Sequence, residues 1–480
     1  MKNNTINKIR IGSDFKLIIA FFNFSRFYIQ PFHASTFNPF PRMPQSIIIQ
    51  TGQCGNQIAH QFWKMAEKEY NLCKSDAFFQ ETETKSESKS KYQARAVLVD
   101  MEESVISRIT NQPKINFYSN TCKVTDNSGA GNNWAVGYHE YFQTHGQEIQ
   151  EILRKEAEKC NSLGSIFLLN STGGGTGSGL GSAIANNLPD WYPEAELFSF
   201  PVYPNRESHD VVTGPYNSLL STEKIQKSMN VVVPFDNAGL AKHVKKREDA
   251  ARPGSSTSTS SSKSSTGYDK LNNVIAKCML DLTAHSRYSG PLNVDINEIS
   301  TNLIPFQDLN YLNINSTTLN NQHLRSAFVN GFSENLNSSV NLKSGIFLAS
   351  AALLRTKKYD LEEVRDAIRH VKKSMKFPIW NTDAWKVGLT TNTGVIKTDG
   401  QLTSLSNSTS TSSFLNFLIS DFNHLFKRKA HLHHYTRIDG CELEHFKEAL
   451  INVNEVSHCY SDLARTWQEK IEIDDLLPIF

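Results

Sequence analysis

The chain has 480 residues and carries 50 lysines and arginines against 48 aspartates and glutamates, which gives a formal net charge of +2. This length allows two or three structural units with a sizeable core, and the balanced charge excludes a global electrostatic attraction to nucleic acid or to a membrane surface. The seven cysteines form no C-x-x-C pair, which favours reduced thiols in the cytosol.

Residues 1–42 differ in character from the rest of the chain. Lys8, Arg10 and Lys16 precede the apolar run 17–22, which superficially resembles a signal peptide. Asn23 ends that run far short of the ~20 residues that a membrane span requires, and no cleavage site of small residues follows. We expect a disordered or wrongly assigned extension, with Met43 as an alternative start, and no other stretch that could cross a membrane.

Short apolar runs then alternate with segments of helical length. The runs are 46–50, 94–100, 165–170, 197–203 and 230–233. This alternation predicts an α/β fold with a parallel sheet and crossover helices. In such sheets ligands bind beyond the carboxyl ends of the strands, so the segments that follow these runs are the candidate sites.

The densest glycine cluster lies in residues 168–180, which read LLNSTGGGTGSGL. Its glycines are Gly173, Gly174, Gly175, Gly177 and Gly179. Glycine lets the backbone approach an anion closely, and the N–H groups of a following helix attract negative charge. Thr176 and Ser178 add hydroxyl donors. Neither the P-loop pattern nor the dinucleotide fingerprint fits, so we predict a phosphate cradle of another kind; a flexible linker is the disfavoured alternative because a strand and an apolar helix flank the run.

Three further strand-to-helix corners carry polar residues. Around Gly52 and Gly55, the side chains of Gln53, Cys54 and Gln57 can face a ligand, although ordinary turn chemistry would be the better explanation if this segment stood alone. Asp100 and Glu102 end a buried run in carboxylates, which suits Mg²⁺ held partly through water; solvated loop acids are the commoner alternative. The third corner, 128–134, again places glycine before a helix start.

The second half of the chain reads as loop, helix and a second unit. The Ser-rich stretch 252–266 predicts a mobile loop, and 268–285 predicts a long helix with one buried stripe. A second unit is expected from about Pro291. Its predicted elements are strands at 311–314, 345–354 and 385–391, a helix at 360–376, an exposed loop at 404–413, and final helices at 414–429 and 442–470.

These four corners, in this order, resemble the tubulin family. Residues 173–179 match the family's glycine motif residue for residue, and the similarity extends over about 43–460. Other matching motifs are Asp236 with Asn237, Tyr268 with Asn272, 215–217 and 429–435. Within the family the sequence resembles the epsilon type most, at 43–46, 100–103, 293–300 and 430–435; the delta or gamma type is the near alternative.

The resemblance implies a domain organisation and a ligand. It implies a parallel-sheet GTP-binding domain (43–267), a long core helix (268–285), a second α/β domain of intermediate position (286–411) and a C-terminal helical region (412–480). GTP with Mg²⁺ is the implied cofactor. Carried over by position, contacts with the phosphates or the base are implied for Gln53, Cys54, Gln57, Ser171 and the segment from Gly173 to Gly179. Asp210 is implied to contact the ribose, and Asn237 and Asn272 the guanine edge. Tyr268 is implied to stack on the ring, and Glu102 and Asp100 to belong to the Mg²⁺ shell.

Glu298 carries the one catalytic role that the resemblance implies. In tubulin polymers the loop after the long helix completes the nucleotide site of the next subunit, and alpha-type chains carry there a glutamate that positions the attacking water. Residues 293–298 keep that glutamate as Glu298. A carboxylate that orients water toward a γ-phosphate is sound chemistry, but an acid at a helix start is the simpler explanation.

The sequence also departs from the alpha and beta forms. Gly214 replaces a glutamate near the ribose, residues 305–354 are shorter at a loop that those forms use for lateral contacts, and the end lacks a long glutamate-rich tail. We reject a metal site at His431, His433 and His434, because no cysteine or carboxylate stands at ligand spacing.

We therefore expect a structural, GTP-binding cytoskeletal protein of the cytoplasm, acting at centrioles or basal bodies in compound microtubule assembly. Its expected partners are other tubulin subunits, microtubules or centriolar components, without nucleic acid or membrane. A scaffold locked on its nucleotide and a stand-alone nucleotide enzyme are the alternatives.

Overall fold

The computed structural model describes residues 44–82, 92–112, 117–205, 211–251, 267–288, 290–319, 323–395 and 399–468. The chain divides into two units, Met1–Arg42 and Met43–Phe480, and all described residues belong to the second. The predictions for 1–42, for Asp210 and for the loop 252–266 therefore lie outside the described residues. Within the described ranges, no helix combines the length and the hydropathy that a membrane span requires.

The first sheet has seven strands in the order β5-β4-β1-β6-β7-β8, with β9 beside β7, and every pairing is parallel. The strands are β1 (Gln45–Thr51), β4 (Ala96–Asp100), β5 (Lys123–Thr125), β6 (Leu163–Ser171), β7 (Glu196–Tyr203), β8 (Val231–Val232) and β9 (Phe235–Asp236). The predicted parallel sheet is confirmed. The run predicted at 94–100 divides at Arg95, because β3 (Tyr92–Ala94) turns away to pair with β2 (Phe79–Glu81) in a separate hairpin-like sheet.

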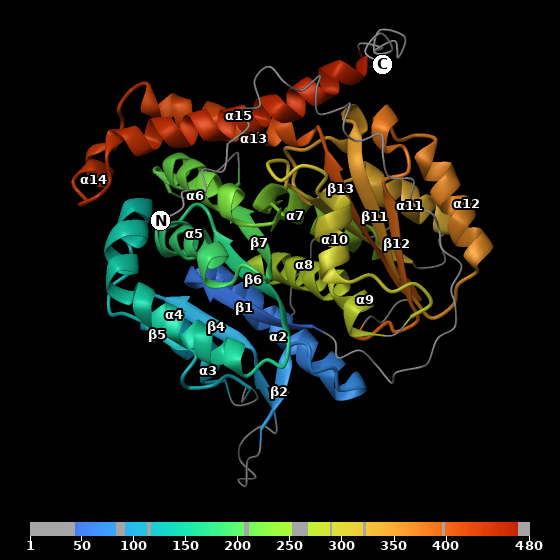
Figure 1. The fold of residues 1–480 in the computed structure, drawn as a ribbon, viewed down its shortest axis with the longest axis horizontal. Helices are drawn as coiled ribbons and strands as arrows, with labels where there is room; N and C mark the ends of the chain where they lie inside the picture. Colours follow the sequence, from blue (N-terminus) through green and yellow to red (C-terminus); the bar gives the residue numbers. More distant parts are fainter. Residues whose placement is uncertain are drawn as a thin grey trace, which may run out of the picture. The chain divides into compact units, whose positions relative to one another are not determined.

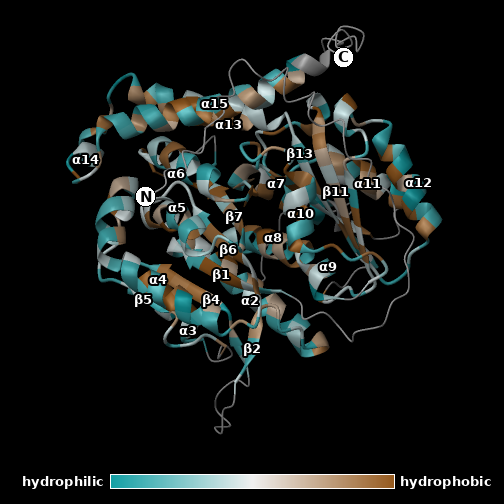
Figure 2. Cartoon of the chain, in the orientation of Figure 1, coloured by the Kyte–Doolittle hydropathy of each residue, from teal (hydrophilic) through white to brown (hydrophobic). Residues whose placement is uncertain are grey.

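Helices cover this sheet in layers (Figure 1). The helices are α2 (Gly52–Cys73), α3 (Glu103–Thr110), η1 (Val136–Tyr141), α4 (Phe142–Glu158), η2 (Thr176–Leu180), α5 (Gly181–Trp191), α6 (Gly214–Ser228) and α7 (Asn237–Ala251). α4, α5 and α6 pack beside one another, while α2 packs on β1, β4 and β6. β1 is buried along its whole length because it pairs on both edges and lies under these helices, and Figure 2 shows the hydrophobic colour gathered on the first-sheet strands.

A long helix leads from the first sheet to the second. α8 (Gly267–Leu282) packs along α2, and α9 (Ala284–Arg287) and α10 (Ile296–Leu303) follow it. The second sheet has the order β10-β13-β11-β12, formed by β10 (Asn313–Leu319), β11 (Phe347–Thr356), β12 (Trp385–Thr390) and β13 (Gly400–Ser408). β13 pairs antiparallel with both neighbours, and β11 pairs parallel with β12. Beside this sheet lie α11 (Leu324–Ser333), η3 (Leu342–Ser344), α12 (Leu361–Lys372) and η4 (Ile379–Asn381).

The exposed loop predicted at 404–413 is wrong. Residues 404–408 belong to β13, which is buried throughout between β10 and β11, and Thr411 already begins a helix. Its polar side chains are accommodated by hydrogen bonds: the Ser404 hydroxyl donates to the carbonyl of Gly331 (2.6 Å), and the Asn407 amide donates to the carbonyl of Leu309 (2.6 Å). A serine-rich strand becomes possible in the core because these partners replace water.

The chain ends in helices that lie over the first sheet's helical layer. α13 (Thr411–Phe426) and α15 (Leu443–Gln468) run side by side and pack on α6, with the short α14 (His433–Thr436) between them in sequence (Figure 1). Both long helices were predicted from the sequence, within a few residues at each end. The fold class predicted from the sequence is thereby confirmed: a parallel sheet, a long helix, a second sheet with helices, and C-terminal helices.

Candidate functional site

Four strand-to-helix corners meet at the carboxyl edge of the first sheet. β1 runs directly into α2, β4 leads to α3, β5 leads to η1 and β6 leads to η2. Because the strands are parallel, these corners share one edge. Gly52 has φ +72°, and a Cβ there would lie 2.9 Å from the backbone nitrogen of Gly177, so the first corner touches the glycine-rich one. At Gly129 a Cβ would lie 2.5 Å from a carboxylate oxygen of Glu102, which joins the two remaining corners.

The glycines of the 173–179 run serve two different purposes. A Cβ at Gly175 would lie 2.7 Å from the Cβ of Ala130, and one at Gly177 would lie 2.7 Å from the hydroxyl of Ser171. Gly179 is crowded by the carbonyl of Trp134. At Gly173 and Gly174, in contrast, the nearest atoms would be 3.4 Å and 3.7 Å away. Packing between corners therefore requires glycine at Gly175 and Gly179, and packing within one corner requires it at Gly177. Gly173 and Gly174 have open space instead, which a phosphate group could approach closely.

Two wide π-helical turns, η1 and η2, pack against each other at this edge. A Cβ at Gly137 would lie 2.6 Å from the carbonyl of Gly175 and 2.8 Å from the backbone nitrogen of Leu180. Single π-helical turns occur often at functional sites. Here glycine allows the two helix starts to approach at backbone distance.

Asn217 on α6 fixes the glycine run through side-chain hydrogen bonds. Its side-chain nitrogen donates to the carbonyls of Asn132 (2.8 Å) and Gly173 (2.9 Å), and its side-chain oxygen accepts from the Trp134 backbone (3.0 Å) and the Tyr435 hydroxyl (2.6 Å). This one buried amide uses both ends to fix two corners and a residue of the C-terminal region. Sequence reasoning did not give Asn217 a role in the site.

Two other buried asparagines do the same at neighbouring corners. Asn56 donates to the carbonyls of Gly52 (3.0 Å) and Val99 (3.1 Å), and Asn170 donates to the carbonyl of Gly177 (3.0 Å). The sequence analysis missed both. For Asn170 an amide at the end of an apolar strand was the available indication, because an unpaired buried amide is costly. Asn56 lies among glycine and glutamine residues and gave no such indication.

Asp100 ends β4 with a buried carboxylate. One oxygen accepts from the backbone of Glu102 (3.2 Å), and the other is buried and has no hydrogen-bond partner among the described residues. Burial raises the pKa of Asp100 to about 7. Glu102 itself is exposed. An unpartnered carboxylate oxygen beside an open acidic side chain fits a hydrated Mg²⁺ ion, because that ion keeps most of its waters and takes one or two carboxylates.

The start of α2 carries three side chains that were predicted to face a ligand. Gln53 is exposed, and Cys54 and Gln57 are half-buried. Burial raises the pKa of the Cys54 thiol to about 12, so the thiol stays protonated. The backbone N–H groups of a first helical turn lack partners within the helix, which leaves them available to an anion.

The hydroxyl role expected for Ser178 is not what the structure shows. Ser178 is fully buried, and its hydroxyl donates to the carbonyl of Gly174, so the side chain stabilises the run internally. Thr176 and Ser171 remain half-buried. Of the hydroxyl side chains in the predicted cradle, these two keep the exposure that a ligand contact needs.

The residues expected to contact a base lie on two helices. Asn237 begins α7 directly after β9 and is half-buried. Tyr268 and Asn272 lie one turn apart on α8, which packs along α2. Tyr268 is 52% exposed, whereas Asn272 is 6% exposed. An exposed ring beside a buried amide suits stacking by the first and edge recognition by the second.

Comparison with known proteins identifies the family. The model for the GTPase domain of the Tubulin/FtsZ family matches residues 45–245. The tubulin epsilon chain of Mus musculus is 35% identical over 463 residues, covering 88% of this chain and 97% of that protein. The human tubulin epsilon chain is 34% identical, with 90% and 98% covered. The chain belongs to the tubulin family.

The same comparison bears on the type within the tubulin family. The tubulin beta-1 chain of Colletotrichum graminicola is 29% identical, with 86% of this chain and 94% of that protein covered. The two epsilon chains thus exceed it in identity and in coverage. The similarity to the epsilon type, predicted from residues 43–46, 100–103, 293–300 and 430–435, is confirmed. The matched GTPase domain contains all four corners and Asn237.

Glu298, the residue that the tubulin resemblance singles out for catalysis, caps a helix. Its carboxylate accepts from the backbone of Asp295 (3.2 Å) and completes a capping box at the start of α10. It also pairs with Lys386 of β12 (3.2 Å) and is 45% exposed. The simpler explanation, an acid at a helix start, describes these contacts, while the exposure leaves the carboxylate open to a neighbouring molecule.

The histidines of the 430–435 run contact one another. The rings of His433 and His434 lie 4.0 Å apart, and His434 contacts the Arg437 guanidinium (2.6 Å). Desolvation and the neighbouring cationic groups lower the pKa of His434. None of these histidines belongs to the group with metal-ligand spacing that the described residues contain.

Proposed function

We propose that this chain is a GTP-binding, epsilon-type tubulin that acts at centrioles or basal bodies in the assembly of compound microtubules. The observation that carries the nucleotide part is the meeting of four helix starts at one sheet edge, with the open backbone of Gly173 and Gly174 between them. The similarity to epsilon chains supports the cellular part. The domain division expected from the sequence belongs to the same proposal.

The phosphates of the nucleotide would lie on the glycine run and on the first turn of α2. Helix starts supply unpaired N–H groups and a favourable dipole, and Thr176 with Ser171 would add hydroxyl donors. Asp100 and Glu102 would hold a hydrated Mg²⁺ ion, whose chemistry is to neutralise charge on the β- and γ-phosphates. The unpartnered oxygen of Asp100 supports this assignment.

The base would be read by amides and stacked on an aromatic ring. Asn237 and Asn272 offer donors and acceptors that match the guanine edge, and Tyr268 offers an exposed face. Adenine presents the opposite donor and acceptor pattern at the edge that these amides would bind. It would leave buried groups unpaired at about 1–3 kcal/mol each.

Competition between GTP and ATP tests this proposal. We expect GTP to win by at least about tenfold for one unpaired group of average cost. Asn272→Ala should reduce the preference, whereas Asn423→Ala on α13 should leave it unchanged. Equal affinity of the native chain for both nucleotides would refute the guanine site.

A further inference from the structure

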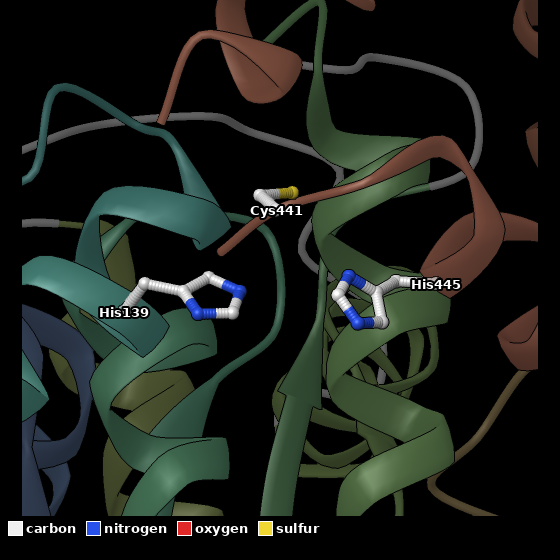
Figure 3. Close-up of side chains that lie close together, drawn as sticks. All are labelled: His139, Cys441 and His445. Atoms are coloured by element: carbon white, nitrogen blue, oxygen red, sulfur yellow. The ribbon is translucent and has the colours of Figure 1, made fainter. Parts of the chain in front are cut away.

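Two histidines and a cysteine from opposite ends of the sequence converge beside η1 (Figure 3). His139 lies in η1, while Cys441 and His445 come from the end of the α14–α15 connection and the first turn of α15. One ligand atom from each residue lies within 4.8 Å of the other two. Among the described residues this is the one group of histidine, cysteine and acidic side chains with such spacing.

The ring of His139 offers an unused nitrogen. Its Nε2 atom is buried and has no hydrogen-bond partner in the described part of the chain. The ring packs edge-on against Trp134 (5.8 Å between centroids) and Tyr138 (5.0 Å), which fixes its orientation. Figure 3 shows this nitrogen directed toward the space between Cys441 and His445. A buried imidazole nitrogen without a partner is costly and calls for an explanation.

The backbone around Cys441 is shaped to place the thiol against that ring. Gly440 has φ +83°, and a Cβ there would lie 3.0 Å from Nδ1 of His139, so any other residue would be strained and crowded. The Cys441 backbone donates to the carbonyl of Ile438 (3.0 Å), and its side chain is 3% exposed. The connection before α15 is therefore fixed in a position that buries the thiol beside His139.

His445 completes the group from α15. Its ring centroid lies 6.0 Å from that of His139, and its Nδ1 atom accepts from the backbone of Glu442 (3.1 Å). Lys224, which lies over the Tyr138 ring, pairs with Glu223 (3.1 Å), and that carboxylate also pairs with Lys227 (2.7 Å). The set of two imidazoles and one thiol is a soft, nitrogen-rich donor set, which zinc prefers and magnesium does not.

We propose that His139, Cys441 and His445 bind one zinc ion, with a water molecule as the fourth ligand. On binding, the Cys441 thiol loses its proton to solvent and its sulfur forms the metal bond, while both imidazoles bind as neutral ligands. A neutral imidazole has one free lone pair, so His445 gives up the hydrogen bond from the Glu442 backbone when it binds the ion. The ion would tie α15 to η1, which packs against η2 of the glycine run. This site is separate from the proposed Mg²⁺ site at Asp100 and does not depend on the proposed function. The alternative is a cluster in which the two histidines serve only as packing groups.

Cobalt substitution tests the proposal on the full-length chain. The metal-free protein should bind one Co²⁺ with the visible absorption of a tetrahedral ion and a near-ultraviolet band from thiolate to cobalt, and Zn²⁺ should displace it. Cys441→Ser should remove the thiolate band and weaken Zn²⁺ binding by more than the roughly 10- to 100-fold that loss of a ligand's hydrogen-bond partner costs. Cys459→Ser, which changes a half-buried cysteine on α15, is the matched control and should bind as the native chain does.

Further measurements keep the test decisive if one variant misfolds. His445→Gln should also lose the tetrahedral spectrum, and Zn²⁺ should raise the Tm of the native chain and of Cys459→Ser but not that of Cys441→Ser. Absence of stoichiometric Co²⁺ and Zn²⁺ binding by the native chain would overturn the proposal. A native cobalt complex without a thiolate band, or a Cys441→Ser protein with native affinity, would do so as well.

Discussion

Neighbouring glycines of the 173–179 run have different environments. A Cβ at Gly175 would lie 2.7 Å from the Cβ of Ala130 and 2.8 Å from the backbone nitrogen of Asn133, whereas at Gly174 no atom would be closer than 3.7 Å. At Gly175 the neighbouring corner must move to admit a methyl group. At Gly174 there is open space for one.

This difference predicts unequal effects of the smallest possible substitution. Gly175→Ala should lower the free energy of unfolding by about 1–3 kcal/mol, as overpacking of a tight contact does, while Gly174→Ala should change it by less than about 0.5 kcal/mol. Urea unfolding without nucleotide measures both. Equal losses in the two variants would show that contact with Ala130 does not limit position 175.

Glu69 on α2 pairs with two arginines in the interior. Its oxygens contact Arg287 of α9 (2.7 Å) and Arg355 of β11 (2.8 Å), and Arg355 also pairs with Asp281 of α8 (2.8 Å). Tyr288 donates to Glu69 as well (2.9 Å). Burial alone would raise the pKa of Glu69, but the two guanidinium groups outweigh it and lower the pKa to about 2.

Glu69→Gln should therefore destabilise the fold and change its response to acid. Leaving buried arginines without their counter-charge costs about 3–5 kcal/mol. Because the folded pKa lies below the ordinary value of 4.5, the carboxylate stabilises the fold fully above that pH and progressively less as the pH falls toward 2. Urea unfolding measured between pH 4.5 and 2 should show that the free energy of unfolding depends less on pH in the variant than in the native chain.

The exposed pair of Glu151 with Arg154 provides the control for Glu69. These side chains are about half exposed on α4, so Glu151→Gln should leave unfolding nearly unchanged. If Glu69→Gln unfolds like the Glu151 variant, the buried network contributes no net stability. In that case the ion pairs of Glu69 would be present in the structure without raising the free energy of unfolding.

At the scale of the element, Glu298 at the start of α10 combines a capping role with the catalytic role that the tubulin resemblance implies. Glu298→Ala removes one of the two side-chain-to-backbone hydrogen bonds of the capping box and should cost about 0.5–2 kcal/mol, the range for loss of an N-cap side chain. Glu298→Gln keeps an acceptor for the Asp295 backbone and loses only the charge. In thermal unfolding, the Tm of the alanine variant should therefore fall further than the Tm of the glutamine variant.

GTP turnover then separates the two roles. If Glu298 positions water in the site of a neighbouring subunit, both variants should bind nucleotide normally and hydrolyse it more slowly wherever subunits meet head to tail. If the residue only caps α10, Glu298→Gln should hydrolyse at the native rate in assemblies. The second result would favour a scaffold that stays locked on its nucleotide.

Elements with apolar patterning were predictable from the sequence, and polar buried elements were not. The parallel strands and the C-terminal helices show hydrophobic runs or stripes, so their positions followed from the pattern. β13 carries serines and threonines inside the second sheet, and its composition indicates a loop until its partners, such as Gly331, are known. The four corners were predictable because parallel strands end at one edge, whereas the asparagines that fix them depend on distant carbonyls.

At the scale of the whole molecule, direct contacts join the C-terminal helices to the carboxyl edge of the first sheet, where the four corners meet. Asn133 donates to the carbonyl of His434 (2.8 Å), Tyr216 donates to that of Ala430 (2.9 Å), and Tyr435 donates to Asn217 (2.6 Å). The cluster of His139 with Cys441 lies at the same junction. No spacing rule predicts such pairs, because they arise only when the two ends of the chain pack together.

These contacts couple the proposed GTP site to the C-terminal helices. The tubulin resemblance also predicts that the segment 305–354 is shorter at a lateral-contact loop, which would disfavour ordinary incorporation along microtubules. Together with the similarity to epsilon chains, this supports the proposed place in compound microtubules.

We therefore expect the chain to concentrate at centrioles or basal bodies rather than along cytoplasmic microtubules. Imaging of a tagged chain in dividing cells measures this, with a tagged beta-type chain as the control for general incorporation. Depletion should leave centrioles or basal bodies without complete compound microtubules, while cytoplasmic microtubules persist. Uniform cytosolic distribution with intact basal bodies after depletion would contradict the cellular role, and it would leave the guanine site, which is measured on the purified chain, unaffected.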